Sequence, residues 1–189
     1  WSPTSNTIAF TIAPAGGLNT QIFTVNPDGT GMRRITAGGR ENNFFSGWTE
    51  DGSALAFSSN TRDSAATDPY LWTVATGQTR RIAQARGLNG VSDVSDDGRW
   101  VLISRLVSRG DNDLYLVNAS NGRERLLTRH TPPAQFGWGE FAPDGRSIYI
   151  TSNADRERAV FARIPLNASG APGRVQILAA REDAEADSA

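Results

Sequence analysis

Trp48-Thr49-Glu50-Asp51-Gly52, followed by the apolar run Leu55-Ala56-Phe57, is the stretch that decides the fold of this 189-residue chain. An Asp-Gly pair between strand-like segments is a strong hairpin signal, because glycine tolerates the positive φ that tight turns require. Two further segments rich in β-forming residues, 70–74 and 79–83, follow and are separated by a turn at 75–78. The stretch therefore predicts a sheet of four short antiparallel strands.

The same combination of turn and apolar run occurs four times. The other copies begin at Trp1-Ser2-Pro3-Thr4-Ser5, Val94-Ser95-Asp96-Asp97-Gly98 and Phe141-Ala142-Pro143-Asp144-Gly145. The spacings from Thr4 to Asp51, Asp51 to Asp97 and Asp97 to Asp144 are 47, 46 and 47 positions. A period of about 40–50 residues with four strands per repeat is typical of a β-propeller. We therefore predict an all-β fold, a β-propeller of about four four-stranded antiparallel blades.

The repeat also sets the domain boundaries. We place a β-propeller segment at 1–178, with blades at about 1–36, 47–83, 93–128 and 138–178, and an acidic tail or start of a linker at 179–189. Propellers of this type more often close with more blades, so we expect an open, partial propeller that exposes apolar residues on its first and last blades. Because the sequence opens inside a repeat, we expect a fragment of a longer protein.

Composition excludes several classes of function. The formal net charge of −1 argues against nucleic acid as a partner, which requires a basic excess. All 19 basic residues are Arg, so a nucleotide P-loop, which needs a Lys, is excluded. The absence of Cys excludes disulfides, a thiolate nucleophile and Cys-ligated zinc. No segment approaches the roughly 20 apolar residues that span a bilayer, so we expect no membrane partner and leave the compartment open.

The up-and-down strand order separates two faces of each blade. The turn face carries the short turns between first and second strands and between third and fourth strands. The loop face carries the connections between second and third strands, at about 13–20, 60–69, 105–112 and 152–158, together with the connections between blades. These connections are predicted to be long loops that differ in every copy. Loops on a rigid scaffold often carry function, so we expect any binding surface on the loop face.

Charged and amide side chains on the loop face are the candidates for peptide or partner contact. They form either a polar rim that grips a peptide or docks a domain, or solvated loops whose exposed ion pairs contribute about 0–1 kcal/mol each. The candidates are Arg40, Glu41, Asn43, Arg62, Asp63, Arg105, Arg109, Arg156 and Glu157.

Other conspicuous residues are interpreted as structural. The turn pairs could resemble calcium ligands, but Asx-type turns are the favoured interpretation for Asp51, Gly52, Asp97, Gly98, Asp144 and Gly145. Trp1, Trp48, Val94 and Phe141 form one column at the start of the innermost strand, and packing between blades is favoured over a ligand platform. We therefore predict no metal site and no cofactor.

His130 is the single histidine of the chain. A serine triad also needs a nucleophile on a Gly-x-Ser-x-Gly elbow, and the chain contains no such motif. A lone His also cannot supply a His-x-x-x-His zinc site. We therefore assign no catalytic residue to this chain.

The repeat resembles blades of a known family. The unit beginning Trp-Ser-Pro, followed by Ile22-Phe23-Thr24-Val25-Asn26-Pro27-Asp28-Gly29-Thr30-Gly31, resembles the WD-repeat-like blades of TolB-type propellers. Three stretches are similar to the N-terminal propeller of the prolyl oligopeptidase family of serine peptidases. They are 111–117 with 125–130, 141–150, and 153–157.

The resemblance implies a non-catalytic propeller that gates peptide access to an α/β-hydrolase domain in cis. In that case the catalytic Ser, Asp and His would lie beyond residue 189. The alternative is a TolB-like propeller that acts as a scaffold for a protein or peptide partner. A sugar-processing propeller is disfavoured, because a catalytic carboxylate pair has no loop-face candidates beyond Glu41, Asp63 and Glu157.

Overall fold

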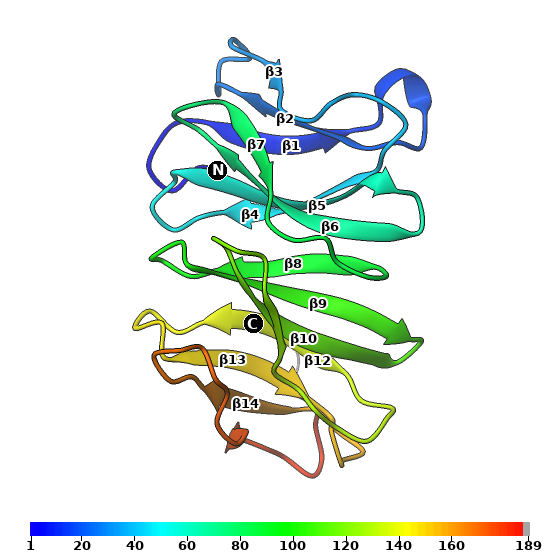
Figure 1. Cartoon of the computed structure of the whole chain (residues 1–189), viewed down its shortest axis with the longest axis vertical. Helices are drawn as coiled ribbons and strands as arrows, with labels where there is room; N and C mark the ends of the chain where they lie inside the picture. The colour runs from blue at the N-terminus through cyan, green and yellow to red at the C-terminus, as the bar shows by residue number, and fades with distance from the viewer. Residues whose placement is uncertain (187–189) are drawn as a thin grey trace. The chain divides into compact units, whose positions relative to one another are not determined.

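The computed structural model describes residues 1–186 and divides into two compact units, one from Trp1 to Val91 and one from Ser92 onward. Residues 187–189, the end of the expected acidic tail, lie outside the described residues. The boundary between the units falls inside one strand, and each unit contains two antiparallel sheets (Figure 1).

Unit 1 is built from short strands joined by turns. Its first sheet has the order β1-β2-β3 and its second the order β4-β5-β6-β7. The elements are β1 (Ile8–Ile12), the 3-10 turn η1 (Pro14–Gly16), β2 (Gln21–Val25), β3 (Arg33–Arg34), β4 (Asn43–Trp48), β5 (Ala54–Asp63), β6 (Ala66–Thr73) and β7 (Gln78–Arg81). The first sheet has three strands and the second has four.

Unit 2 repeats the same order twice, as β8-β9-β10-β11 and β12-β13-β14-β15. Its strands are β8 (Asn89–Val94), β9 (Trp100–Ser108), β10 (Asp111–Asn118), β11 (Glu124–Leu126), β12 (Phe136–Phe141), β13 (Ser147–Ser152), β14 (Val160–Pro165) and β15 (Gln176–Ala179). Four sequential antiparallel sheets confirm the predicted all-β propeller fold.

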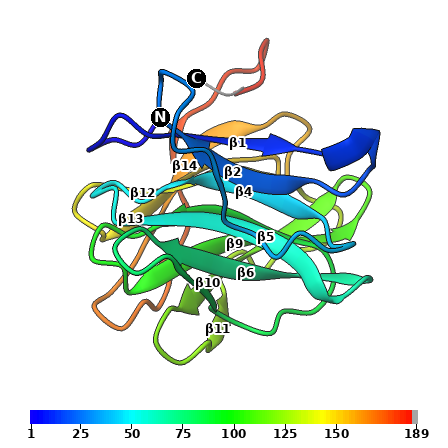
Figure 2. The ribbon, with the colours of Figure 1, turned by 90° about the horizontal axis from the view of Figure 1, so that it is seen from above.

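Alternating apolar side chains form a core within each unit. In unit 1 the buried cluster consists of Ile22, Ile35, Leu55, Phe57 and Trp72. In unit 2 the corresponding cluster includes Leu102, Leu114, Leu116, Ile148, Ile150 and Ile164. Within unit 1, β4 of the second sheet lies beside β2 of the first, and the Asn43 N–H donates to Thr20 O at 3.1 Å (Figure 2). These cores hold the loop-face connections on rigid strands.

Two predicted loops are wrong. Residues 60–69 and 105–112 are mostly strand, because β5–β6 and β9–β10 are long hairpins with tips at Ser64-Ala65 and Arg109-Gly110. Asp63 pairs with Ala66, and Ser108 pairs with Asp111. Cross-strand pairing overrides the weak β-propensity of these polar residues, since strand preference depends strongly on context.

The aromatic column also differs from the prediction. Trp48, Val94 and Phe141 end the first strand of their sheets, whereas the prediction placed them at its start. Val94 is buried, and Trp48 and Phe141 are half-buried against the two cores. Trp1 is 70% exposed, so the packing interpretation does not hold for it. Apolar side chains are also exposed in the first and last sheets, among them Ile12, Met32, Val175 and Ile177.

Candidate binding surfaces

The Asp-Gly turns of the turn face share one geometry. The Asp Oδ1 atom accepts the N–H of the residue two positions later, at 2.9 Å in the Asp51 turn, 3.0 Å in the Asp97 turn and 2.9 Å in the Asp144 turn. The following glycines have φ between 64° and 66°, where residues with a Cβ are strained. Each carboxylate therefore has a structural hydrogen bond within its own turn. The residues are Asp51, Gly52, Asp97, Gly98, Asp144 and Gly145.

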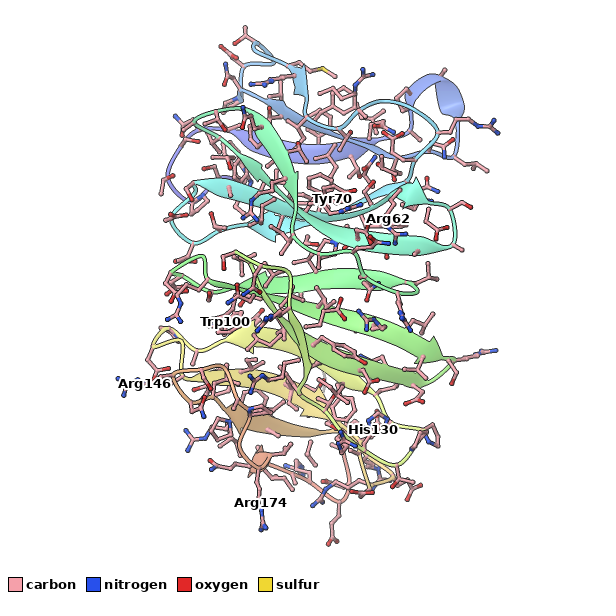
Figure 3. All side chains as sticks on the ribbon, viewed as in Figure 1. Arg62, Tyr70, Trp100, His130, Arg146 and Arg174 are labelled. Atoms are coloured by element: carbon pink, nitrogen blue, oxygen red, sulfur yellow. The ribbon has the colours of Figure 1, made fainter. Side chains whose placement is uncertain are left out.

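Arg62 lies on the β5–β6 hairpin of unit 1 and binds a buried carboxylate (Figure 3). Its Nε and Nη2 atoms lie 2.6 and 3.0 Å from the two oxygens of Asp68, and Nη2 also donates to Ala85 O at 3.0 Å. Asp68 is 0% exposed and accepts the Ala85 N–H at 2.9 Å. The hydrogen bond to Asp68 raises the pKa of Arg62. Arg62 therefore ties the hairpin to the following connection.

Asp63 completes the tip of the same hairpin. Its Oδ1 atom accepts the Ala65 N–H at 2.9 Å, and Oδ2 lies 3.5 Å from Arg62 Nη1. About half of its side chain is exposed. Asp63 is therefore a turn residue that still presents a carboxylate edge to solvent.

Glu41 and Asn43 are buried beneath the loop face of unit 1. Glu41 Oε1 accepts the N–H groups of Gly38 and Gly39 at 2.9 and 3.2 Å. Burial opposes ionisation of Glu41, but these backbone donors outweigh it, so the pKa of Glu41 lies below its usual value. Asn43 Nδ2 donates to Thr20 O at 2.9 Å. Arg40, which precedes Glu41 in the same connection, is exposed.

Arg105 of unit 2 lies flat on its own sheet. Its guanidinium lies 4.1 Å from the centre of the Tyr115 ring and 2.8 Å from Glu124 Oε2. Arg109 is exposed in the two-residue tip between β9 and β10. Arg156 and Glu157 are exposed in the β13–β14 connection. The structure therefore leaves Arg109, Arg156 and Glu157 accessible and holds Arg105 in place.

His130 forms a pair with a buried carboxylate in unit 2. Its Nδ1 atom lies 2.7 Å from Thr128 O and its Nε2 atom 2.9 Å from Asp111 Oδ1. Both partner oxygens accept hydrogen bonds, so the protonated imidazole, in which both ring nitrogens donate, satisfies both contacts. Burial lowers the pKa of His130, but the hydrogen bonds to Thr128 O and Asp111 outweigh it, and the pKa is raised overall. The hydrogen bond from the Ala134 N–H, together with that from His130, lowers the pKa of Asp111.

Sequence reasoning missed two features of the loop face. One is the burial of Asp68 and Asp111, two loop-face carboxylates that each stand three residues before a buried Leu. The other is a set of exposed large apolar side chains, consisting of Leu18, Phe44 and Leu88 in unit 1 and Leu106 and Val107 in unit 2. The consecutive Leu106 and Val107 within an otherwise polar hairpin end could have indicated the second feature.

Residues 1–186 contain no group of three or more His, Cys, Asp or Glu side chains arranged to hold a metal ion. Within the same range, no helix is long and apolar enough to cross a membrane.

Sequence comparison finds partial relatives. No protein-family model matches the chain. It is 34% identical over 104 residues to an uncharacterised protein of Agrobacterium fabrum, covering 53% of this chain and 32% of that protein. It is 29% identical over 84 residues to the Tol-Pal system protein TolB of Wolinella succinogenes, covering 44% of this chain and 19% of that protein. The chain thus matches a third or less of the length of these curated relatives.

Solved structures extend the likeness over nearly the whole chain. TolB from Acinetobacter baumannii matches with a TM-score of 0.61 at 18% identity, over 93% of this chain and 43% of that one. A prolyl endopeptidase matches with a TM-score of 0.70 at 15% identity, over 94% of this chain and 27% of that one. An oligogalacturonate lyase from Vibrio parahaemolyticus matches with a TM-score of 0.68 at 18% identity, over 88% of this chain and 47% of that one. At these identities the likeness establishes the fold alone, so the chain is a β-propeller of the type found in TolB and in the prolyl oligopeptidases.

Proposed function

We propose that this chain is a non-catalytic propeller segment whose loop face binds a protein or a peptide. The observation that carries the proposal is the exposure of large apolar side chains there. Leu106 and Val107, beside the β9–β10 tip, are 53% and 55% exposed, and Leu18 in unit 1 is 90% exposed. Exposed apolar side chains with Arg nearby, here Arg109, are typical of protein contact surfaces.

The polar residues beneath these side chains support the proposal. Asp68, Asp111 and Glu41 are all engaged by backbone N–H groups, which fixes the hairpins and connections that present the apolar side chains. A surface that is ordered before binding loses less conformational entropy on association. The accessible candidates Arg40, Asp63, Arg109, Arg156 and Glu157 would then form the polar rim of such a surface.

A TolB-like scaffold is one setting for this surface. The sequence match to TolB of Wolinella succinogenes, at 29% identity over 84 residues, supports it, because that match rests on residue identities. In this setting the partner is a separate protein.

A gating propeller of a prolyl-oligopeptidase-like serine peptidase is the second setting. The prolyl endopeptidase match, with a TM-score of 0.70 over 94% of this chain, supports it. In this setting the partner is an α/β-hydrolase domain in cis that supplies the catalytic Ser, Asp and His, and the propeller restricts access to short peptides.

Site-specific photo-crosslinking in the native host tests the binding surface. A crosslinking residue replaces Leu106 or Leu18 on the loop face, and a matched control replaces Met32, which is 55% exposed on the turn face of unit 1. We expect one defined adduct from positions 106 and 18 and none from position 32. Equal yields at all three positions, or no adduct at any, would contradict the proposal.

The reading frame around this segment separates the two settings. A downstream Gly-x-Ser-x-Gly followed by Asp and His would indicate the peptidase. Further blades without a hydrolase would indicate the scaffold, and the crosslinked adduct would then be with another protein.

A further inference from the structure

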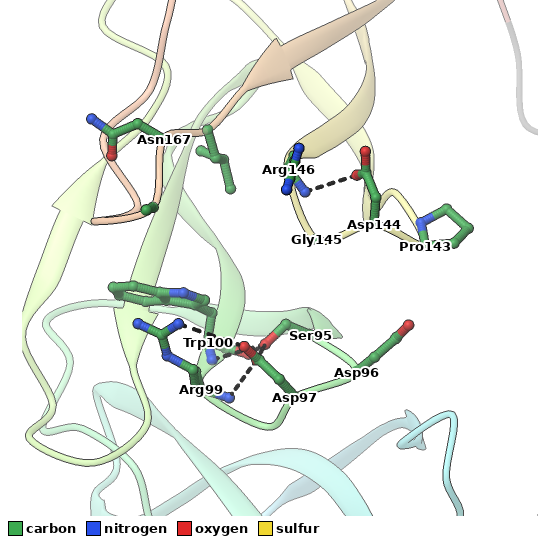
Figure 4. A pocket seen from close by; sticks show the side chains of 12 residues that line it. Ser95, Asp96, Asp97, Arg99, Trp100, Pro143, Asp144, Gly145, Arg146 and Asn167 are labelled. Carbon is green, nitrogen blue, oxygen red and sulfur yellow. Dashed lines mark hydrogen bonds and ion pairs between the residues drawn. The ribbon is translucent and has the colours of Figure 1, made fainter.

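A groove of about 450 Å³ lies on the turn face of unit 2, opposite the surface proposed above (Figure 4). Its walls are the β8–β9 turn, the β12–β13 turn and the segment that follows β14. The lining side chains include Trp100, Leu166 and Pro143 together with carboxylates and two guanidiniums. The volume lies within the range of about 300–1,000 Å³ that is usual for ligand sites.

Trp100 forms a fixed aromatic floor in this groove. Its backbone N–H donates to Ser95 Oγ at 3.0 Å, which holds the start of β9 against the preceding turn. A Cβ at Gly170 would come within 2.9 and 3.0 Å of two indole carbons, so the ring edge lies close against this glycine. The indole is half-buried and packs on the core of unit 2, so its orientation is set before any ligand arrives.

The charges around the indole favour a cationic ligand. Three carboxylates line the groove against two guanidiniums. One guanidinium is already engaged, since Arg99 lies 5.8 Å from the centre of the Trp100 ring and 3.8 Å from Asp97. The other, Arg146, also lines the groove, so the carboxylates outnumber the guanidiniums by one.

Two carboxylates have acceptor capacity to spare. Asp144 Oδ1 accepts the Arg146 N–H at 2.9 Å, and Oδ2 has no hydrogen-bond partner among residues 1–186. Within the same range the exposed Asp96 side chain has neither a hydrogen bond nor an ion pair. The carboxylates of Asp96 and Asp144 therefore line the same groove as the Trp100 indole.

We propose that this groove binds an extended peptide segment by an Arg or Lys side chain, which lies over the indole of Trp100 with its charge next to Asp96 and Asp144. Trp is the best aromatic partner for such a cation, and carboxylates at the rim add charge-assisted hydrogen bonds. The position of Arg99 near the same ring is an intramolecular example of this contact. The site is separate from the loop face, so the chain would hold two partners, or two parts of one partner, on opposite faces of unit 2.

Fluorescence anisotropy with two dye-labelled peptides, Gly-Pro-Arg-Pro-Gly and Gly-Pro-Glu-Pro-Gly, tests this site on the whole chain. We expect the Arg peptide to bind at least about tenfold more tightly than the Glu peptide, because a carboxylate meets Asp96 and Asp144. Asp96→Lys and Trp100→Leu should each weaken the Arg peptide by about fivefold or more. Glu182→Lys, the same charge change at an exposed site of the same unit, should leave the affinity unchanged.

Equal affinity for the two peptides, or an unchanged affinity in Asp96→Lys, would overturn the proposal. Asp96 is exposed and, within residues 1–186, its side chain has neither a hydrogen bond nor an ion pair, so this variant tests the proposal even if Trp100→Leu does not fold. Binding of a neutral oligosaccharide such as maltohexaose, lost in Trp100→Leu, with no binding of the Arg peptide would also overturn it in favour of a carbohydrate site. Neither result depends on the crosslinking outcome at Leu106.

Discussion

Asp68 in unit 1 and Asp111 in unit 2 have the same place in their sheets, three residues before the first buried Leu of the third strand. Each carboxylate is buried and accepts a backbone N–H from the connection to the next sheet, Ala85 in unit 1 and Ala134 in unit 2. The cations differ, because Asp68 pairs with Arg62 and Asp111 pairs with His130. Arg keeps its charge at any physiological pH, whereas His titrates.

In the first sheet of unit 1, an uncharged side chain, Gln21, accepts the backbone N–H from the connection to the next sheet. Gln21 Oε1 accepts the Gly38 N–H at 3.0 Å and the Thr36 hydroxyl at 2.7 Å, with no ion pair. The three sheets therefore order equivalent connections with a permanent ion pair, a titratable ion pair and an amide. We expect the consequences of breaking them to differ in size and in pH dependence.

The largest effect on stability is expected from breaking the Arg62–Asp68 ion pair. Asp68→Ala leaves Arg62 without its carboxylate and the buried Ala85 N–H without an acceptor, so we expect the free energy of unfolding to fall by about 3 kcal/mol. Urea unfolding followed by tryptophan fluorescence measures this change. Asp63→Ala, at the half-exposed neighbour, is the control and should cost less than about 1 kcal/mol. Similar costs for the two variants would contradict the assigned role of Asp68.

An intermediate effect is expected from pH. The pKa of His130 is raised in the folded chain, so its contribution is fully present below the ordinary His pKa and is lost as pH rises through the raised value. We expect unit 2, but not unit 1, to lose local stability as pH rises above the ordinary His pKa of about 6.5. Hydrogen-exchange protection factors at Leu114 and Leu127, compared with Leu71 and Ile82, measure the difference.

His130→Gln supplies the control for the pH experiment. Gln retains hydrogen-bonding capacity without a titrating group, so the pH dependence in unit 2 should disappear. The pKa of Asp111 is lowered, so its contribution is lost only as pH falls through and below the ordinary Asp value, and measurements above about pH 5 are not affected by it. Equal pH dependence in wild type and His130→Gln would show that another group titrates.

The smallest effect on stability is expected from replacing Gln21, which forms hydrogen bonds but no ion pair in the first sheet. Gln21→Ala removes the acceptor of the Thr36 hydroxyl and one of the two acceptors of the Gly38 N–H, which keeps Glu41 Oε1. No ion pair is broken, so we expect a loss of about 1–2 kcal/mol in the same urea experiment. A cost equal to that of Asp68→Ala would mean that burial of the connection, and not the charge of the anchor, sets the stability.

The repeat made much of the fold predictable. Turn residues at Asp51, Asp97 and Asp144 recur at nearly constant spacing and are followed by apolar runs, and local chemistry alone dictates a hairpin at each. The strand segments predicted at 70–74 and 79–83 overlap β6 and β7. The hairpin ends at 60–69 and 105–112 were not predictable in this way, since their polar residues become strand only by pairing with each other.

The candidate surfaces were predictable only in part. The sequence determined which residues could carry charge on the loop face, and why a nucleophile elbow, a P-loop and a cysteine-based site are excluded. Only the tertiary structure decided that Arg62, Arg105 and Glu41 have partners of their own, whereas Arg109 is exposed. Arg62 meets Ala85 O across 23 positions of the chain and Arg105 meets Glu124 across 19, and local sequence patterns do not encode contacts at such separations.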